Sequence, residues 1–164
     1  MKQQDNTVGS RSDIDRAYIA GFLDGDGSVM LQIKKRKDGN ISSHRFMATI
    51  CFYQDARHAK PLMWIRKVLG IGHIAYRNDG MAELRVNGFG QIERILESLL
   101  PFIKFKKIQA KNILHSVRLL QKSERTEKDL RMIVEDILRV QSENYATRKK
   151  KTKEDMLAML GLTP

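Results

Sequence analysis

The chain contains a single cysteine, Cys51, among its 164 residues. One thiol excludes a disulfide within the chain and any zinc site built from several cysteines. No stretch approaches the roughly 18 consecutive apolar residues of a membrane-spanning helix, and the first residues lack the apolar run of a secretory signal. We therefore expect no membrane partner, a reducing intracellular compartment, and Cys51 as a small core or groove-facing residue.

Acidic residues are too few to balance the basic ones. The chain has 30 Lys and Arg against 19 Asp and Glu, a net charge of +11 and a pI near 9.9. Such an excess favours polyanions, because each phosphate neutralised by a cationic side chain releases condensed counterions. An anionic membrane surface or simply a solvated basic surface would also fit, but without an apolar span we favour nucleic acid as the partner.

Hydrophobic periodicity predicts one α+β domain. Helical patterns cover residues 17–24, 59–69, 91–100, 104–122, 127–141 and 154–160. Alternating patterns typical of strands cover residues 28–37, 43–53, 73–77 and 81–87, in two hairpins. The order predicts an antiparallel sheet with helices on one face. We assign a flexible arm to residues 1–11, the core to 12–122, and C-terminal helices with a basic loop of the same domain to 123–164.

The strand faces opposite the apolar ones carry side chains that suit the edges of bases in a major groove. The residues predicted to contact DNA there are Gln32, Lys34, Arg36, Arg45, Met47, Thr49, Cys51, Arg77, Glu83 and Arg85. Any one of them alone is equally an ordinary solvated strand residue. The basic run near the C-terminus is typical of phosphate contacts, which position a protein without reading sequence. That run comprises Arg148, Lys149, Lys150, Lys151 and Lys153.

Small residues recur along the first predicted helix. Ala17, Gly21 and Gly25 lie every fourth position, with Ala20 beside them. Such a flat stripe lets another backbone approach closely, either within the same core or from a second copy about a two-fold axis.

The acidic turn at residues 24–27 follows this stripe, and we expect its glycines to end the helix with positive φ. Carboxylates at a helix C-terminus face an already negative dipole. A hard cation such as Mg²⁺ would relieve that repulsion. Taken alone, however, the same four residues are better explained as a simple turn that ends the helix, because Asp-Gly pairs are frequent in turns.

The nine residues from Ile19 to Gly27, IAGFLDGDG, followed by Ser28, resemble the signature of the LAGLIDADG homing endonucleases. The likeness extends over residues 13–160 and includes the stretch from Leu100 to Lys106 and the basic tail. It implies an αββαββα core whose saddle-shaped antiparallel sheet binds duplex DNA. Because one motif is present, it also implies a homodimer, and the expected interface residues are Ala17, Ala20, Gly21, Asp24 and Gly25.

The resemblance further implies metal-dependent hydrolysis of both strands at a long, pseudo-palindromic site, as in intron homing. Asp26 and the carbonyl of Gly25 would bind Mg²⁺, and Mn²⁺ or Ca²⁺ could occupy the same site. Gln54 would orient the attacking water, and Lys106 would assist the water or stabilise the phosphorane. His58 occupies a position where the family often has another basic side chain.

Two other functions remain open for this family. Members act as RNA maturases with intron RNA as partner, and others bind nucleic acid without cutting it. A ribosomal or other structural RNA-binding protein would explain the charge but not the stripe that ends in acids. The resemblance fits a chloroplast, a mitochondrion, or a prokaryotic or archaeal cytoplasm, wherever DNA is accessible.

Overall fold

The computed structural model describes residues 12–36, 44–144 and 150–163. The elements are α1 (Asp13–Asp26), β1 (Gly27–Lys35), β2 (His44–Asp55), the 3-10 turn η1 (Ala56–His58), α2 (Lys60–Leu69), β3 (His73–Tyr76), β4 (Met81–Asn87), α3 (Phe89–Leu99), α4 (Lys107–Leu120), α5 (Glu127–Glu143) and α6 (Lys153–Met159). The predicted order of helices and hairpins is confirmed. The predicted N-terminal arm, together with Arg148 and Lys149, lies outside the described residues.

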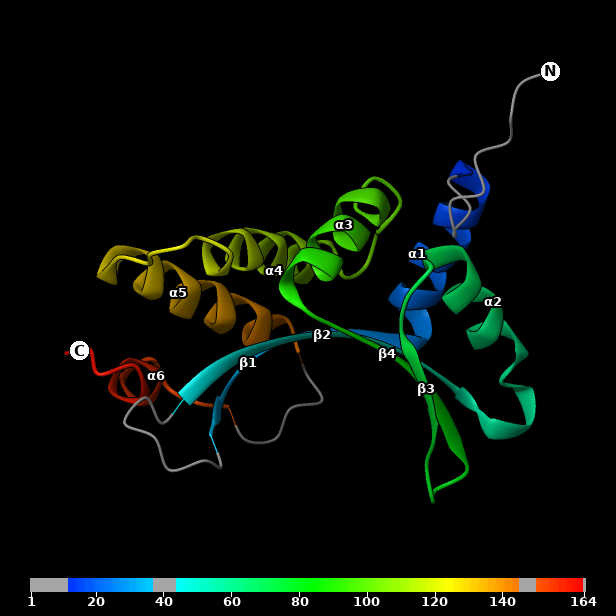
Figure 1. Cartoon of the computed structure of the whole chain (residues 1–164), viewed down its shortest axis with the longest axis horizontal. Coiled ribbons are helices and arrows are strands. Elements are labelled where there is room, and N and C mark those ends of the chain that lie inside the picture. The colour runs from blue at the N-terminus through cyan, green and yellow to red at the C-terminus, as the bar shows by residue number, and fades with distance from the viewer. Residues whose placement is uncertain (1–11, 37–43, 145–149, 164) are drawn as a thin grey trace.

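The four strands form one antiparallel sheet in the order β1-β2-β4-β3. Helices α3, α4 and α5 lie along one face of this curved sheet, and α1 and α2 pack towards its other end (Figure 1). The opposite face carries none of these five helices (Figure 1). This arrangement is the α+β architecture that the element order predicts, with one sheet face left for a partner.

The core lies between the sheet and the helices. Alternate residues of the first hairpin point into it, as the period-two pattern predicts. The residues of this hairpin that belong to the core cluster are Val29, Leu31, Ile33, Ala48, Ile50 and Phe52. They pack in one cluster with residues of every helix, including Leu62 of α2 and Ile113 of α4. Burying each large side chain contributes about 1.5–3 kcal/mol, so this continuous cluster stabilises the whole sheet.

Helix α1 begins as expected, because the Ser12 hydroxyl accepts the N–H of Asp15 at 3.1 Å. Its end differs from the prediction. The helix continues to Asp26, and its C-terminal cap, Gly27, has φ −125°, so no left-handed glycine ends it. Strand β1 starts at once, and the chain therefore leaves α1 extended. Gly27 is needed for space instead: a Cβ there would lie 2.8 Å from the Leu23 backbone.

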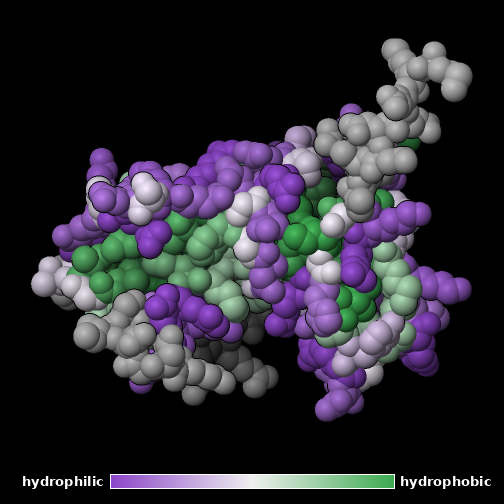
Figure 2. Space-filling view, in the orientation of Figure 1, coloured by the Kyte–Doolittle hydropathy of each residue, from purple (hydrophilic) through white to green (hydrophobic). Residues whose placement is uncertain are grey.

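The two C-terminal helices begin at capping boxes. Thr126 and Asp129 exchange the reciprocal hydrogen bonds at the start of α5, and Thr152 and Asp155 do so at α6. In the view of Figure 2, a hydrophobic band lies between the helices and the sheet, and hydrophilic residues gather on the outer side of the helices. None of the helices in the described part of the chain combines the length and apolar character needed to cross a bilayer.

Candidate functional site

Asp24 connects the end of α1 to the start of α4. Its carboxylate accepts the backbone N–H groups of Lys104 at 2.7 Å, Phe105 at 3.0 Å and Lys106 at 2.9 Å. Partial burial alone would raise the pKa of Asp24, but these donors, Lys106 first, bring its pKa below the ordinary value. This bonding also explains why α4 begins at Lys107 rather than at the predicted residue 104, since the three preceding N–H groups turn toward α1. Asp24 is therefore a structural acid.

Lys106 lies between the two acids of the motif. Its ammonium donates to the backbone carbonyl of Asp24. The group is half-buried, and desolvation lowers its pKa, although the charges of Asp24 and Asp26 oppose that shift. The ammonium also sits 5.2 Å from the centroid of the Phe105 ring. The charge of Asp26 therefore acts on Lys106, so two of the predicted catalytic residues belong to the same end of α1.

Asp26 is the exposed acid of the pair. It is the last residue of α1, and Gly25 beside it is also exposed. No hydrogen bond to the Asp26 carboxylate is found among the residues that the structure covers. The negative end of the α1 dipole disfavours this free carboxylate, so a cation at this point would stabilise it.

Two oxygen donors of the right type for a metal lie together in the described part of the chain, which is fewer than the six ligands that Mg²⁺ takes. Asp26 supplies a carboxylate and Gly25 a carbonyl, which suit a hard divalent cation. Within residues 12–36, 44–144 and 150–163 there is no group of three or more His, Cys, Asp or Glu side chains that could bind one. Because Mg²⁺ takes six ligands, the remaining ones would come from water, phosphate or a second chain.

Gln54 lies near the same end of the sheet. Phe52 pairs with Gly27, so Gln54 extends beyond the first residue of β1, beside the end of α1. Its Oε1 accepts the N–H of Asp55 at 2.9 Å, which leaves the amide N–H₂ group as a donor.

His58 is placed differently. It is exposed at the end of η1, beside the ion pair between Asp55 and Arg57. The hydrogen bonds from Arg57, and after them the charge of His58, hold the pKa of Asp55 well below its usual range. The structure therefore brings Asp26, Lys106 and Gln54 towards one end of α1, and His58 is exposed at the end of η1.

Gln109 lines the same region, although no role for it was predicted from the sequence. A pocket of about 300 Å³ lies between α1, β1, α4 and the end of α5, and its walls include Gly25, Ser28 and Lys106. Gln109 is buried there, and its Oε1 has no hydrogen-bond partner among the residues that the structure describes. The position three residues after Lys106 on α4 is the only signal of this proximity in the sequence.

The predicted small-residue stripe is exposed except at one position. Ala17, Gly21 and Gly25 are exposed, and a Cβ built on Gly21 or Gly25 would meet nothing within 4 Å. Ala20 is fully buried in the core of its own chain, so its predicted place in a dimer interface is wrong. It lies with Ile19 and Leu23 on the buried side of α1.

Most of the predicted DNA-contacting side chains are exposed on the open sheet face or next to it. Those exposed are Gln32, Lys34, Arg36, Arg45, Arg77 and Arg85, with Met47 half-buried. Arg85 forms a 2.7 Å ion pair with Glu83, and Arg77 forms one of 2.6 Å with Asp79 in the turn of the second hairpin. These pairs fix the directions of two guanidinium groups on the sheet.

Three residues of that face are not exposed, contrary to the prediction. Thr49 is 2% exposed, Cys51 0% and Glu83 8%. They lie on the inner strands β2 and β4, where neighbours on both sides and on the twisted face cover them. Thr49 donates to Asn87 at 2.9 Å, and Glu83 holds Arg85. In this chain the three side chains are therefore covered, and Thr49 and Glu83 bond to the exposed neighbours Asn87 and Arg85.

Comparisons with known proteins agree with this geometry. The profile of the LAGLIDADG endonuclease family matches residues 19–114. DNA endonuclease I-CvuI of Chlorella vulgaris is 38% identical over 104 residues, which are 63% of this chain and 64% of that protein, so the match spans less than two thirds of its length. DNA endonuclease I-CreI of Chlamydomonas reinhardtii is 24% identical over 143 residues, 87% of this chain and 86% of that protein.

The solved structures extend the likeness to nearly the whole chain. The structure of I-CvuI in complex with the I-CreI target has a TM-score of 0.77 and 29% identity, and the match covers 90% of this chain and 93% of that one. The family profile covers more than half of the residues, including both acids of the motif and Lys106. This chain therefore belongs to the LAGLIDADG endonuclease family.

Proposed function

We propose that this chain is a site-specific homing endonuclease that hydrolyses both strands of a long, pseudo-palindromic DNA site as a homodimer. The observation that supports this most directly is the difference in bonding and exposure between the carboxylates of Asp24 and Asp26. Asp24 is used within the fold, whereas Asp26 is exposed, has no hydrogen bond to its carboxylate among the described residues, and influences the charge of Lys106. A protein that only binds DNA has no need of a free carboxylate facing a phosphate backbone.

The proposed cofactor is Mg²⁺, with Mn²⁺ or Ca²⁺ able to occupy the same site. Asp26 and the carbonyl of Gly25 would hold it. Relatives support the choice of a divalent ion, because I-CvuI–DNA complexes were crystallised with Mg and with Ca. A bound ion would polarise the phosphate oxygens and lower the pKa of the attacking water.

The chain's own side chains would then position the reaction. The ammonium of Lys106 would stabilise the negative charge that develops on the phosphate, and its lowered pKa would make its proton easier to give up. The free amide N–H₂ of Gln54 is oriented by the bond from Asp55 and would donate to a phosphate oxygen or a water. His58 is exposed, and rotation of its side chain would bring it to a flanking phosphate.

Self-association would complete the site. The exposed stripe of Ala17, Gly21 and Gly25 leaves the backbone of α1 open to the same stripe of a second copy. A two-fold axis there would bring two Asp26 carboxylates near each other. This agrees with the shortage of ligands in the described part of a single chain.

Base reading would come from the open sheet face. A two-stranded ribbon fits the major groove, and arginine pairs well with guanine while glutamine pairs with adenine. Gln32, Lys34, Arg36, Arg45, Arg77 and Arg85 are the exposed side chains that we assign to this role. Arg148, Lys149 and Lys150 would contact phosphates, and the protein would work in a compartment where DNA is accessible, such as an organelle or a prokaryotic cytoplasm.

The test compares wild type, Asp26→Asn and the control Asp13→Asn on a randomised duplex library with Mg²⁺. Asp13 is an exposed acid at the other end of α1 and pairs only with Arg16 in the described structure. We expect Asp26→Asn to bind the selected site but to cut at least about a hundredfold more slowly, and Asp13→Asn to cut normally. Unchanged cutting by Asp26→Asn would refute the assignment. Binding without cutting by wild type would indicate a non-catalytic binder or a maturase.

A further inference from the structure

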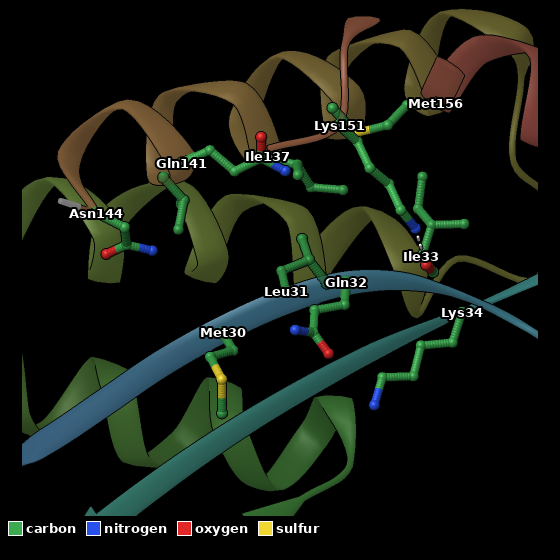
Figure 3. A pocket seen from close by; sticks show the side chains of 11 residues that line it. Met30, Leu31, Gln32, Ile33, Lys34, Ile137, Gln141, Asn144, Lys151 and Met156 are labelled. Atoms are coloured by element: carbon green, nitrogen blue, oxygen red, sulfur yellow. Dashed lines mark hydrogen bonds between the residues drawn. The ribbon is translucent and has the colours of Figure 1, made fainter. Parts of the chain in front are cut away.

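The C-terminal segment reaches the outer edge of the sheet at one point. The Lys151 ammonium donates to the backbone carbonyl of Ile33 at 2.8 Å, across 118 positions of sequence (Figure 3). Lys151 belongs to the basic run near the C-terminus that the sequence predicted to contact phosphates. In the structure its charged group is directed to β1 instead.

The acceptor is unusual because of where β1 lies. β1 is an edge strand, so the backbone groups on its outer side have no partner strand. The Ile33 side chain is buried, while Gln32 and Lys34 on either side are exposed on the opposite face. Figure 3 shows Gln32 and Lys34 directed away from Lys151, on the other side of the strand. The bonded carbonyl belongs to the peptide that leads directly into Lys34.

A pocket of about 280 Å³ separates this part of β1 from the C-terminal helices. Its walls include Ile137 and Gln141 of α5 and Met156 of α6, as well as Lys151. The lysine thus bridges this pocket from the C-terminal segment to β1.

The position of Lys151 is held before any DNA arrives. The next residue, Thr152, caps α6: its hydroxyl accepts the N–H of Asp155 at 3.1 Å, and its own N–H donates to Asp155 at 3.2 Å. Met156 is buried in the core, and Lys153 forms an ion pair with Glu135 of α5. The backbone on the C-terminal side of Lys151 is therefore fixed to α5 and the core.

We infer that Lys151 is a specificity-determining positioning residue. By holding the carbonyl of Ile33, it sets the orientation of the peptide before Lys34 and so the direction in which Gln32 and Lys34 enter the groove. The neighbouring Lys150 is exposed and serves as the phosphate contact. The effect on base preference rests on the proposed function, that is, on β1 reading bases. The hydrogen bond from Lys151 to the Ile33 carbonyl, which we call the tether, is present in the free protein.

The tether is tested first without DNA. Lys151→Met keeps the aliphatic stem and removes the donor, Lys151→Arg keeps a donor, and Lys150→Met is the matched loss of one charge. Hydrogen exchange of the peptide spanning residues 31–36 should become about three- to tenfold faster in Lys151→Met, with little change in the other two. Equal exchange in Lys151→Met and Lys150→Met would overturn the inference, whether or not the protein cuts DNA.

The second test measures binding to duplexes that carry single base-pair changes in a selected site. The Lys34→Ala variant identifies the base pair that β1 reads, because its preference should change there. Lys151→Met should lose about three- to tenfold of the preference at the base pair mapped by Lys34→Ala and keep the salt dependence of binding. Lys150→Met should weaken binding to all duplexes alike and reduce the salt slope by about one. A Lys151→Met variant that behaves like Lys150→Met would show a phosphate contact and refute the positioning role. If Lys34→Ala does not change the base preference, base reading by β1 is refuted. The hydrogen-exchange result would still show whether Lys151 holds the Ile33 carbonyl.

Discussion

Asp24 and Lys106 are joined twice across 82 positions of sequence: the carboxylate accepts the backbone N–H of Lys106 at 2.9 Å, and the Lys106 ammonium donates to the backbone carbonyl of Asp24. This double link connects the C-terminus of α1 to the N-terminus of α4. As a result, the ammonium is held at the end of α1, within the electrostatic influence of Asp26, before any substrate binds.

Asp24→Asn should therefore act on stability. The amide nitrogen of Asn would face N–H groups that now donate to a carboxylate oxygen, and the loss of hydrogen bonds to a charged acceptor costs about 1–3 kcal/mol. Urea unfolding measures this change. Asp26→Asn, at an exposed carboxylate, should change the unfolding free energy by less than about 0.5 kcal/mol. Equal effects of the two substitutions would contradict the division between a structural and a catalytic acid.

Gly27→Ala should destabilise the protein because of a direct clash. The added Cβ would lie 2.8 Å from the Cα and the carbonyl oxygen of Leu23, both backbone atoms that cannot move aside cheaply. Overpacking of this kind costs about 1–3 kcal/mol, and thermal unfolding should show a lower midpoint. A midpoint equal to that of wild type would mean that the helix-to-strand junction relaxes without strain.

Gly21→Ala should have the opposite effect on a single chain. Nothing lies within 4 Å of a Cβ at this position, and alanine is favoured over glycine in a helix by up to about 1 kcal/mol. If α1 packs closely against α1 of a second copy, the same methyl group should raise the dimer dissociation constant by about tenfold, or about 1.4 kcal/mol. Sedimentation over a dilution series measures it. An unchanged constant would place the interface elsewhere.

Cys51 should be unreactive in the native protein. Burial raises the pKa of its thiol, and the side chain is fully buried. Because the thiolate is the reactive form, a thiol reagent at pH 8 should modify the folded chain roughly a hundredfold more slowly than the chain in urea. Rapid native labelling would show that β2 and β4 open this face in solution, and would restore Cys51 as a candidate for contact with DNA.

Asp129 should make the protein sensitive to acid. Its hydrogen bond with Lys122, and then the N–H of Thr126, lower its pKa from 3.8 to about 2. A depressed folded-state pKa stabilises the fold above pH 3.8 and loses that contribution as the pH falls toward about 2. The difference in unfolding free energy between wild type and Asp129→Asn should be constant near neutral pH and shrink below about pH 4. A difference that does not change with pH would contradict this.

Local signals predicted the elements but missed several of their ends. Period-two alternation correctly placed Val29, Leu31 and Ile33 in the core, and the capping residues of α5 marked its start. The glycines of the acidic turn predicted a left-handed end for α1, but Gly27 leaves the helix extended and pairs at once with Phe52 of β2, which comes close only when the sheet forms. Ala20 was misassigned for a similar reason, since the inner side of α1 depends on the sheet beneath it.

Two features of this protein are determined by the sequence alone: the strongly basic charge and the single motif with its pair of acids, because composition and short-range spacing do not depend on how the chain folds. The tertiary structure decided which acid is free and which is bonded, which residues of the reading face are exposed, and which lysine of the basic run is directed to β1. These depend on contacts such as Asp24 with Lys106 and Lys151 with Ile33, which join positions 82 and 118 residues apart. No local pattern predicts them, because each partner acquires its role only when the packing of the helices on the sheet brings the two together.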